Sequence, residues 1–259
     1  MAAEGEAALV VSPTVKIHVE PIVGAEQVRE NIRSNMTRGL PVIPWAKRKR
    51  RRKLIVAAGG PSLDPGEFSS GDVASINRCL EHLVSRDVVP KYWFAMDPQP
   101  MLAEYVIRHP KVIYCVASSC DPAVFDKLRG LDVRLWHCYN EQGEETVLPP
   151  GTPMLGGGHT MASRAPMLGR FMGYCRSELH GVDSSIENGK FHAYEMPPPD
   201  GNLVGVRVGD RVFWTNVAML AQAKYLQDRI ERWKGEGIKV EVKGSGLLPT
   251  MLECSGSFV

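Results

Sequence analysis

The chain has 259 residues, 44% of them hydrophobic, and a formal net charge of only +2 at pH 7. It is long enough to bury a full core, and its charge balance excludes a global basic field that would attract nucleic acid nonspecifically. Six scattered cysteines without a C-x-x-C pair, no signal-peptide pattern and no apolar run of about 18 residues predict a soluble, cytoplasmic protein of a reducing compartment, with no membrane partner.

Residues 1–50 are predicted to form an N-terminal arm with one short helical candidate, Ala25–Thr37, ahead of a domain over residues 51–259. An extreme run of charge marks the boundary. It comprises Lys47, Arg48, Lys49, Arg50, Arg51, Arg52 and Lys53. These cations could contact the phosphates of nucleic acid or of a bound nucleotide. The absence of interleaved aromatic residues favours the alternative, a solvated segment at the entrance to the domain.

The stretch Leu54–Leu63 reads as a buried strand followed by a turn of small residues. Gly59 and Gly60 let the backbone approach a ligand closely, and Ser62 offers a hydroxyl beyond the carboxyl end of the strand. The sequence is neither Gly-x-Gly-x-x-Gly nor a Walker loop, so an ordinary strand-to-loop turn is the alternative.

Two interpretations fit the next segment. The apolar spacing over residues 72–86 is close to helical, whereas a short strand over residues 73–76 would place Asn77 at its carboxyl end, level with Ser62. The following strand, Tyr92–Met96, ends at Asp97, which precedes proline and is either a metal ligand or a turn former.

The middle of the chain continues the alternation of strands and helices. Strands are predicted over residues 111–117 and 132–137, with a helix over residues 122–128 that Asp121 caps. Trp136 and His137 are assigned to packing rather than to catalysis. Residues 139–153 are acidic, rich in proline and typical of turns.

Glycines run directly into a helix in the stretch Leu155–Arg164. Such a loop presents unpaired N–H groups and the positive end of the helix dipole to an anion, which makes Gly157 and Gly158 candidate nucleotide-binding residues. Thr160 adds a hydroxyl. His159 is a candidate ligand contact or general acid or base.

The next strand ends in Gly-Val-Asp at Asp183. The polar segment over residues 188–194 carries His192 and Tyr194, and a proline-rich break follows at residues 197–199. This segment is either an active-site loop or an ordinary surface loop.

The rest of the chain predicts a β-hairpin over residues 204–208 and 211–214, a helix from Thr215 and a strand over residues 238–242. A tight closing turn is expected over residues 244–249.

Together these elements resemble the 6-hydroxymethylpterin diphosphokinase MptE-like domain family, particularly its members from phages and prophages. The family is itself distantly similar to bacterial sialyltransferases. Five motifs occur in the family's order: Ala58–Leu63, Ser75–Asn77, Pro90–Asp97, Gly156–Thr160 and Leu179–Ser184. The resemblance implies an α/β, Rossmann-like three-layer domain with a mainly parallel sheet that binds a nucleotide at the carboxyl ends of the strands.

The resemblance also implies roles for individual residues. Gly60, Ser62 and Asn77 match the positions that hold the phosphate and sugar of a cytidine nucleotide donor in the sialyltransferase-like relatives. Asp97 and Asp183 match aspartates expected to bind the magnesium of ATP in the pterin kinases, and magnesium needs only one or two carboxylates besides phosphates.

The first hypothesis is therefore a nucleotide-dependent transferase, with ATP or a CMP-sugar as donor and an unidentified acceptor. Phosphoryl transfer would use Asp97, Asp183, the loop over residues 156–160 and Arg164. Glycosyl transfer would use His159 or His192 as base, with Tyr194 near the leaving group.

The second hypothesis is a non-catalytic nucleotide or nucleic-acid binding protein of phage origin, which would bind through the basic run. A third possibility is that the glycine loops are only structural. The sequence leaves the oligomeric state open, a homo-oligomer included, and does not choose between a cellular and a phage origin.

Overall fold

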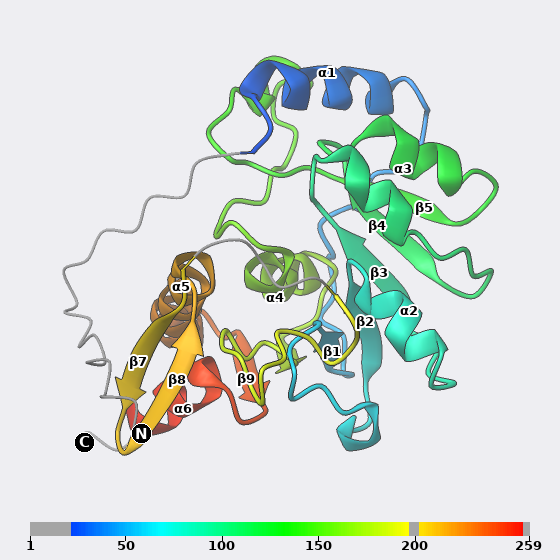
Figure 1. The fold of residues 1–259 in the computed structure, drawn as a ribbon. Coiled ribbons are helices and arrows are strands. Elements are labelled where there is room, and N and C mark those ends of the chain that lie inside the picture. Colours follow the sequence, from blue (N-terminus) through cyan, green and yellow to red (C-terminus); the bar gives the residue numbers. More distant parts are fainter. Residues whose placement is uncertain (1–21, 197–201, 256–259) are drawn as a thin grey trace.

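The computed structural model describes residues 22–196 and 202–255 and is built on a seven-stranded sheet with the order β5-β4-β3-β2-β1-β6-β9 (Figure 1). Its strands are β1 (Leu54–Ala57), β2 (Asp72–Ile76), β3 (Tyr92–Ala95), β4 (Ile113–Ala117), β5 (Val133–Trp136), β6 (Arg176–His180) and β9 (Lys239–Lys243). Every neighbouring pair is parallel. The predicted α/β, Rossmann-like fold is therefore confirmed.

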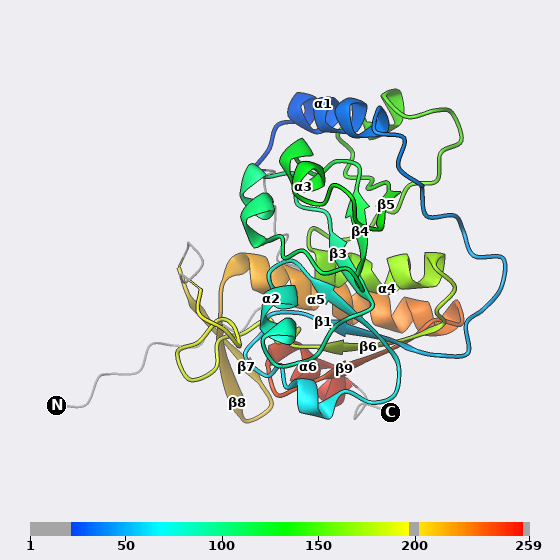
Figure 2. The same ribbon diagram turned by 90° about the vertical axis from the view of Figure 1, so that its right-hand side faces the viewer.

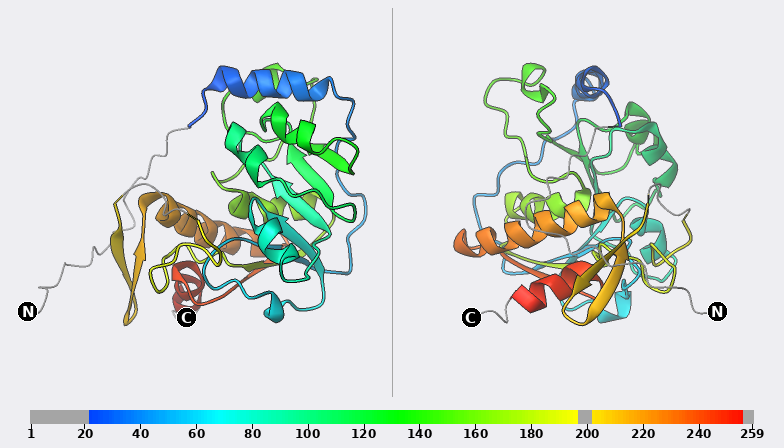
Figure 3. Two further views of the ribbon diagram at one scale, coloured as in Figure 1. Left: turned by 45° about the vertical axis from the view of Figure 1, so that its right-hand side comes forward. Right: turned by 60° about the vertical axis from the view of Figure 1, so that its left-hand side comes forward.

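The helices cover both faces of the sheet. They are α1 (Ala25–Met36), α2 (Cys79–Val84), α3 (Pro122–Lys127), α4 (Met161–Phe171), α5 (Val217–Gly235) and α6 (Leu247–Ser255), with 3₁₀ turns η1 (Pro65–Glu67), η2 (Pro100–Tyr105) and η3 (Glu144–Thr146). Right-handed crossovers that run in opposite directions from β1 place α2 and α3 on one face and α4 and α5 on the other (Figure 3). Ligands bind to such folds at this change of direction, here between β1 and β6.

The central strands consist almost entirely of buried residues because both faces of the sheet are covered. All four residues of β1 are fully buried, and so are Trp93 in β3 and Tyr114 in β4. This burial explains the continuous apolar pattern of these strands, since no face is left to carry polar residues.

Of the two interpretations of residues 72–86, the strand is confirmed and the single helix is wrong: β2 ends at Ile76, Asn77 follows it in a left-handed conformation with φ of 45°, and α2 begins at Cys79. One further expectation about secondary structure is corrected. Residues 244–249 are not a closing turn throughout, because α6 begins at Leu247. Pro249 lies in the first turn of α6, where its missing N–H would have no helical partner.

The smaller elements lie at the two ends of the sheet. A separate hairpin pairs β7 (Val204–Val208) with β8 (Arg211–Thr215), as predicted. At the other end α1 lies over α3 (Figure 2), where the amides of Asn31 and Asn35 donate to the backbone oxygens of residues 118–120. The part of the predicted arm that the structure describes is therefore fixed to the domain.

Within residues 22–196 and 202–255, none of the helices combines the length and apolarity needed to cross a membrane. The predicted break at residues 197–199 and the first 21 residues of the predicted arm lie outside the described residues.

Candidate functional site

A cavity of about 290 Å³ lies at the carboxyl ends of β1, β2 and β6. It is lined by residues 58–61, 76–77, 160–162, 181–185, 191–192, 194, 219 and 222, and we call it the strand-end cavity. Its volume is at the lower end of the range of about 300–1,000 Å³ that is usual for ligand pockets. It coincides with the switch point of the sheet, where this fold class binds its ligands.

The turn after β1 can form only with glycines at two positions. A Cβ on Gly59 would lie 2.3 Å from the hydroxyl oxygen of Tyr194 and 3.1 Å from Nδ1 of His192. A Cβ on Gly60 would lie 2.3 Å from Oδ2 of Asp183 and 2.5 Å from the carbonyl oxygen of Gly181. The two glycines therefore let the turn, the end of β6 and the loop over residues 189–196 pack closely together.

The side chain of Asp183 holds this turn in place through hydrogen bonds to Ser62. Its carboxylate accepts the backbone N–H of Ser62 at 3.0 Å and the Ser62 hydroxyl at 2.5 Å. Asp183 is 1% exposed, and burial raises the pKa of its carboxyl group against the opposing effect of the Ser62 hydrogen bonds. Ser62 itself does not line the strand-end cavity, so its hydroxyl holds Asp183 instead of pointing at a phosphate.

Asn77 follows β2 and lines the cavity next to the glycine turn. Its backbone oxygen accepts the indole N–H of Trp93 at 2.8 Å, whereas its Oδ1 is buried and has no hydrogen-bond partner among the described residues. A buried acceptor without a partner costs about 1–3 kcal/mol. A hydroxyl or amino group of a bound ligand would satisfy it.

Helix α4 points its N-terminus into the cavity through Thr160, Met161 and Ala162. Thr160 and Ser163 form a capping box in which the Thr160 hydroxyl oxygen accepts the Ser163 backbone N–H at 3.2 Å. The first N–H groups of a helix have no helical acceptor and carry partial positive charge. This end of the cavity is therefore suited to an anion.

His192 and Tyr194 form the opposite wall, with their rings stacked at a centroid separation of 5.5 Å and an interplanar angle of 9°. Nδ1 of His192 lies 3.1 Å from the carbonyl oxygen of Gly59. Because that oxygen can only accept, Nδ1 carries the proton and Nε2 keeps its lone pair. Burial lowers the pKa of His192 below its usual value, which leaves the ring neutral at pH 7.

The side chain of Arg164 fixes the glycine loop before α4 through hydrogen bonds. Arg164 is 2% exposed and donates to the carbonyl oxygens of Leu155, Gly158 and Tyr139 and to the side-chain oxygen of Asn140. Its guanidinium is thus committed to the loop, in contrast to the predicted role in neutralising a phosphate.

Several other predicted site residues lie outside the strand-end cavity. Gly157 and Gly158 do not line it: a Cβ on either would lie within 2.5 Å of the side-chain oxygen of Tyr225 or Ser163, so these glycines serve packing. His159 is exposed and lines neither this cavity nor the neighbouring one. Asp97 accepts the N–H of Gln99 at 3.0 Å, as expected of a turn former.

The two predicted magnesium ligands do not fit a shared ion. Asp97 follows β3 and Asp183 follows β6, three strand spacings or about 14 Å apart across the sheet. Both oxygens of the Asp183 carboxylate in addition already accept hydrogen bonds from Ser62. Among the described residues, no group of three or more His, Cys, Asp or Glu side chains is placed to hold a metal ion.

The basic run lies at the amino-terminal end of β1, about 13 Å of strand away from the cavity. Three of its side chains are bound internally: Arg50 donates to the Met172 carbonyl oxygen, and Arg52 and Lys53 pair with Asp72 and Glu178. The run therefore cannot contact a nucleotide in the strand-end cavity. Lys47, Arg48, Lys49 and Arg51 stay exposed, as expected for a solvated segment.

Some lining residues were not predicted from the sequence. Met219 and Gln222 enter from α5, and Phe191 from the loop that follows β6. Gln222 donates to the Ser184 hydroxyl at 2.9 Å. Their contribution depends on how α5 packs, which no local signal specifies.

Comparison with solved structures finds proteins of similar fold. The fold is similar to the structure of the MAf glycosyltransferase from Magnetospirillum magneticum AMB-1, with a TM-score of 0.67 and 12% sequence identity over 92% of this chain. The similarity covers 42% of that protein, so the chain spans less than half of its length. No family model matches the sequence, the MptE-like family included, and no curated protein matches it either. The comparison shows a fold shared with a glycosyltransferase.

Proposed function

We propose that the chain is a glycosyltransferase-like transferase whose nucleotide donor binds in the strand-end cavity. One observation carries the proposal: the turn at Gly59 and Gly60, the unpartnered Oδ1 of Asn77 and the N-terminus of α4 converge on one cavity at the switch point of the sheet. A nucleotide consists of a base, a sugar and a phosphate. A backbone that allows close approach, a buried polar group and an anion site are the features that bind these parts. The fold shared with a glycosyltransferase supports the same function.

The charge of the cavity favours a donor with one phosphate. No lysine or arginine lines the cavity in the part of the chain that the structure describes, so α4 supplies the main positive potential. The end of a helix carries about half an elementary charge, which suits a single phosphate better than a diphosphate. A nucleoside monophosphate sugar, the CMP-sugar class, therefore fits better than ATP or a UDP-sugar.

His192 is placed to act as the general base. The acceptor hydroxyl would attack the anomeric carbon of the donor sugar, its proton would pass to Nε2 of His192, and the nucleotide would leave with the bonding electrons. The N-terminus of α4 would stabilise the charge on the departing phosphate. Tyr194 supports the ring of His192 by stacking, and burial raises the pKa of Tyr194, so its phenol stays protonated.

Thermal unfolding with CMP, a CMP-sugar, UDP-sugars, ATP and GTP, each with and without magnesium, tests the proposal. A ligand at 100 times its dissociation constant adds about 2.7 kcal/mol of stability. We expect a shift with the cytidine monophosphate ligands that needs no magnesium. A magnesium-dependent shift with ATP alone would support diphosphoryl transfer instead, and no shift with any nucleotide would end the transferase proposal.

A pair of matched variants locates the site. Asn77→Gly removes the unpartnered amide but keeps a residue that tolerates positive φ, and it should weaken the nucleotide shift. Asn188→Gly makes the same change at an exposed position with φ of 50° outside the strand-end cavity, and it should leave the shift intact. If both variants keep, or both lose, the nucleotide-induced rise in melting temperature, the nucleotide binds elsewhere.

A further inference from the structure

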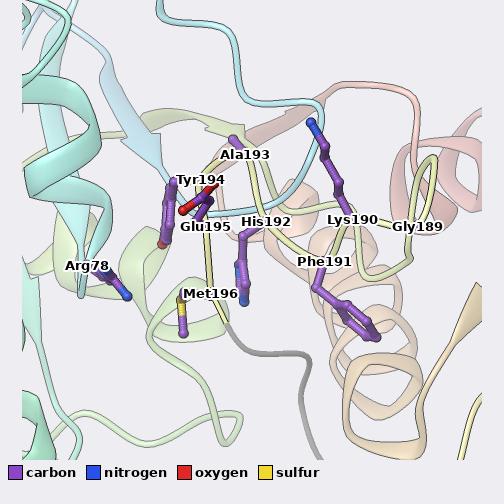
Figure 4. Close-up of a pocket in the computed structure, with 9 residues that line it drawn as sticks. All are labelled: Arg78, Gly189, Lys190, Phe191, His192, Ala193, Tyr194, Glu195 and Met196. Carbon is purple, nitrogen blue, oxygen red and sulfur yellow. The ribbon is translucent and has the colours of Figure 1, made fainter.

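A second, larger cavity of about 670 Å³ adjoins the strand-end cavity. It is lined by Arg78 and by residues 189–196, and we call it the loop cavity (Figure 4). The side chains of Phe191, His192 and Tyr194 line both cavities. His192, the candidate base, therefore lies on the wall between the two cavities. A transferase needs its base in such a place, because the base must reach the acceptor hydroxyl while the donor is bound next to it.

Arg78 gives the loop cavity its chemical character. Figure 4 shows its side chain directed from the start of α2 toward the loop that carries His192 and Tyr194. Its Nε lies 3.4 Å from an exposed Glu81 carboxylate oxygen, and its guanidinium lies 5.6 Å from the centre of the Tyr105 ring. The two terminal NH₂ groups have no acceptor among the described residues. They leave a planar fork that matches a carboxylate or a phosphate in bidentate geometry.

The positive charge of Arg78 also acts on both aromatic side chains of the wall. It lowers the pKa of His192 and opposes the burial that raises the pKa of Tyr194. Lys190 lines the same cavity, but in Figure 4 its amine lies well apart from Arg78, and both Lys190 and Glu195 are exposed. Arg78 is thus the cation that a ligand beside His192 would meet.

We infer that the loop cavity binds the acceptor and that Arg78 selects an acceptor bearing a carboxylate or a phosphate, with the reacting hydroxyl next to His192. This inference rests on the proposed function, because it names the class of acceptor for the same transfer reaction. The anion pairs with Arg78, and the apolar faces of Phe191 and Tyr194 contact the body of the acceptor.

The test is NMR of the full chain with labelled histidine, saturated with CMP. N-acetylneuraminate and glucuronate represent carboxylates, glucose 6-phosphate represents phosphates, and methyl galactoside is the neutral control. We expect the chemical shift of His192 to change on addition of at least one acidic class of sugar. The concentration needed should be at least 10-fold lower than the concentration of methyl galactoside that gives the same change. The class that binds more tightly identifies the anionic group.

Variants separate this inference from the proposed function. Arg78→Met should abolish the 10-fold preference while the CMP-induced rise in melting temperature persists. Arg86→Met removes an exposed cation near the end of α2, outside the loop cavity, and should keep the preference. Equal affinity for acidic and neutral sugars in the unchanged protein, or a preference that survives Arg78→Met, would overturn the inference alone. Loss of the CMP shift in Arg78→Met would assign Arg78 to the donor and overturn it too, whereas no CMP shift in the unchanged protein would remove both proposals.

Discussion

Ser62 donates both its backbone N–H and its hydroxyl to the carboxylate of Asp183, although 121 positions separate the two residues in the sequence. A carboxylate is the one side-chain group that can accept both donors, one on each oxygen. The turn after β1 is thereby fixed to the end of β6. Asp183 was predicted to be a metal ligand and catalytic residue, and its contacts indicate that it shapes the strand-end cavity by holding the glycine turn.

Asp183→Asn should destabilise the protein, because the amide has one acceptor oxygen and presents a donor to Ser62. A buried donor without a partner costs about 1–3 kcal/mol, which chemical denaturation will detect. Asp210→Asn changes an exposed aspartate in the hairpin turn and should alter the unfolding free energy by less than about 0.5 kcal/mol. Unchanged stability of Asp183→Asn together with lost ligand binding would return Asp183 to a direct ligand role.

Gly59→Ala should disturb the wall formed by His192 and Tyr194. The new methyl group would lie 2.3 Å from the Tyr194 hydroxyl oxygen, and overpacking of this kind costs about 1–3 kcal/mol. The nucleotide-induced thermal shift should fall as well. Gly235→Ala is the matched control: it lies in α5 with open space around it and should stabilise the protein by up to about 1 kcal/mol. A Gly59→Ala protein as stable as the unchanged one would contradict the close packing of this turn.

His192→Asn should lower kcat by about 10²–10⁴-fold, the usual contribution of a general base, with little change in the nucleotide shift. The acid limb of the pH–rate profile should lie below the ordinary histidine pKa of 6.5, since burial lowers the pKa of His192. His159→Asn makes the same change at the exposed histidine and should leave kcat unchanged. If His159→Asn abolishes turnover and His192→Asn does not, the base has been misassigned.

The unfolding free energy should fall as the pH drops below about 6.5. Burial lowers the pKa of His82, His137, His180 and His192 from 6.5, so the unfolded chain binds more protons than the native state between the lowered pKa values and 6.5. The stabilisation is complete above 6.5 and is lost as the pH falls through that window. Each unit of lowering is equivalent to about 1.4 kcal/mol. Chemical denaturation at pH 7.5 and 5.5 measures the difference, and a flat or opposite dependence would contradict it.

Lys53→Met should destabilise the protein more than Lys47→Met, although both remove one charge from the basic run. Lys53 pairs with Glu178, whose carboxylate is buried and also accepts the Ser69 hydroxyl. Loss of the lysine leaves that carboxylate with a weaker set of partners, at a cost of about 1–3 kcal/mol. Lys47 is exposed, and its substitution should change stability by less than about 0.5 kcal/mol. Equal effects would mean that the pair at Lys53 contributes nothing to the fold.

The fold was largely predictable because its strands are buried on both faces and keep a continuous apolar pattern, as in β1 and β4. Asp121 was also identified correctly as a helix cap, since capping depends on neighbours in sequence and its carboxylate accepts the Ala123 N–H. The segment over residues 72–86 was ambiguous because the burial of β2 depends on its position between β1 and β3. Only Asn77, with its left-handed backbone, and Arg78 separate the strand from α2.

The site was predictable only in part. The sequence singled out Gly59, Gly60 and Asn77 through their position after strands, and His192 through its place in a polar loop, and all four line the strand-end cavity. It could not show that Asp183 binds Ser62, because that contact is set by the neighbouring positions of β1 and β6. For the same reason Arg78 was not singled out, since its direction depends on how α2 begins.

The residues packed around Asp183 include Gly244 and Gly246, which come much later in the sequence. A Cβ on Gly244 would lie 2.1 Å from the Ser62 hydroxyl oxygen, and one on Gly246 would lie 2.4 Å from the Cβ of Asp183. The glycine turn is made early in protein synthesis, but the segment that encloses its anchor is made after β9. A ribosome-bound chain that stops before Gly244 therefore lacks the segment that packs against Ser62 and Asp183, and the anchor of the glycine turn is enclosed only after translation has passed this point.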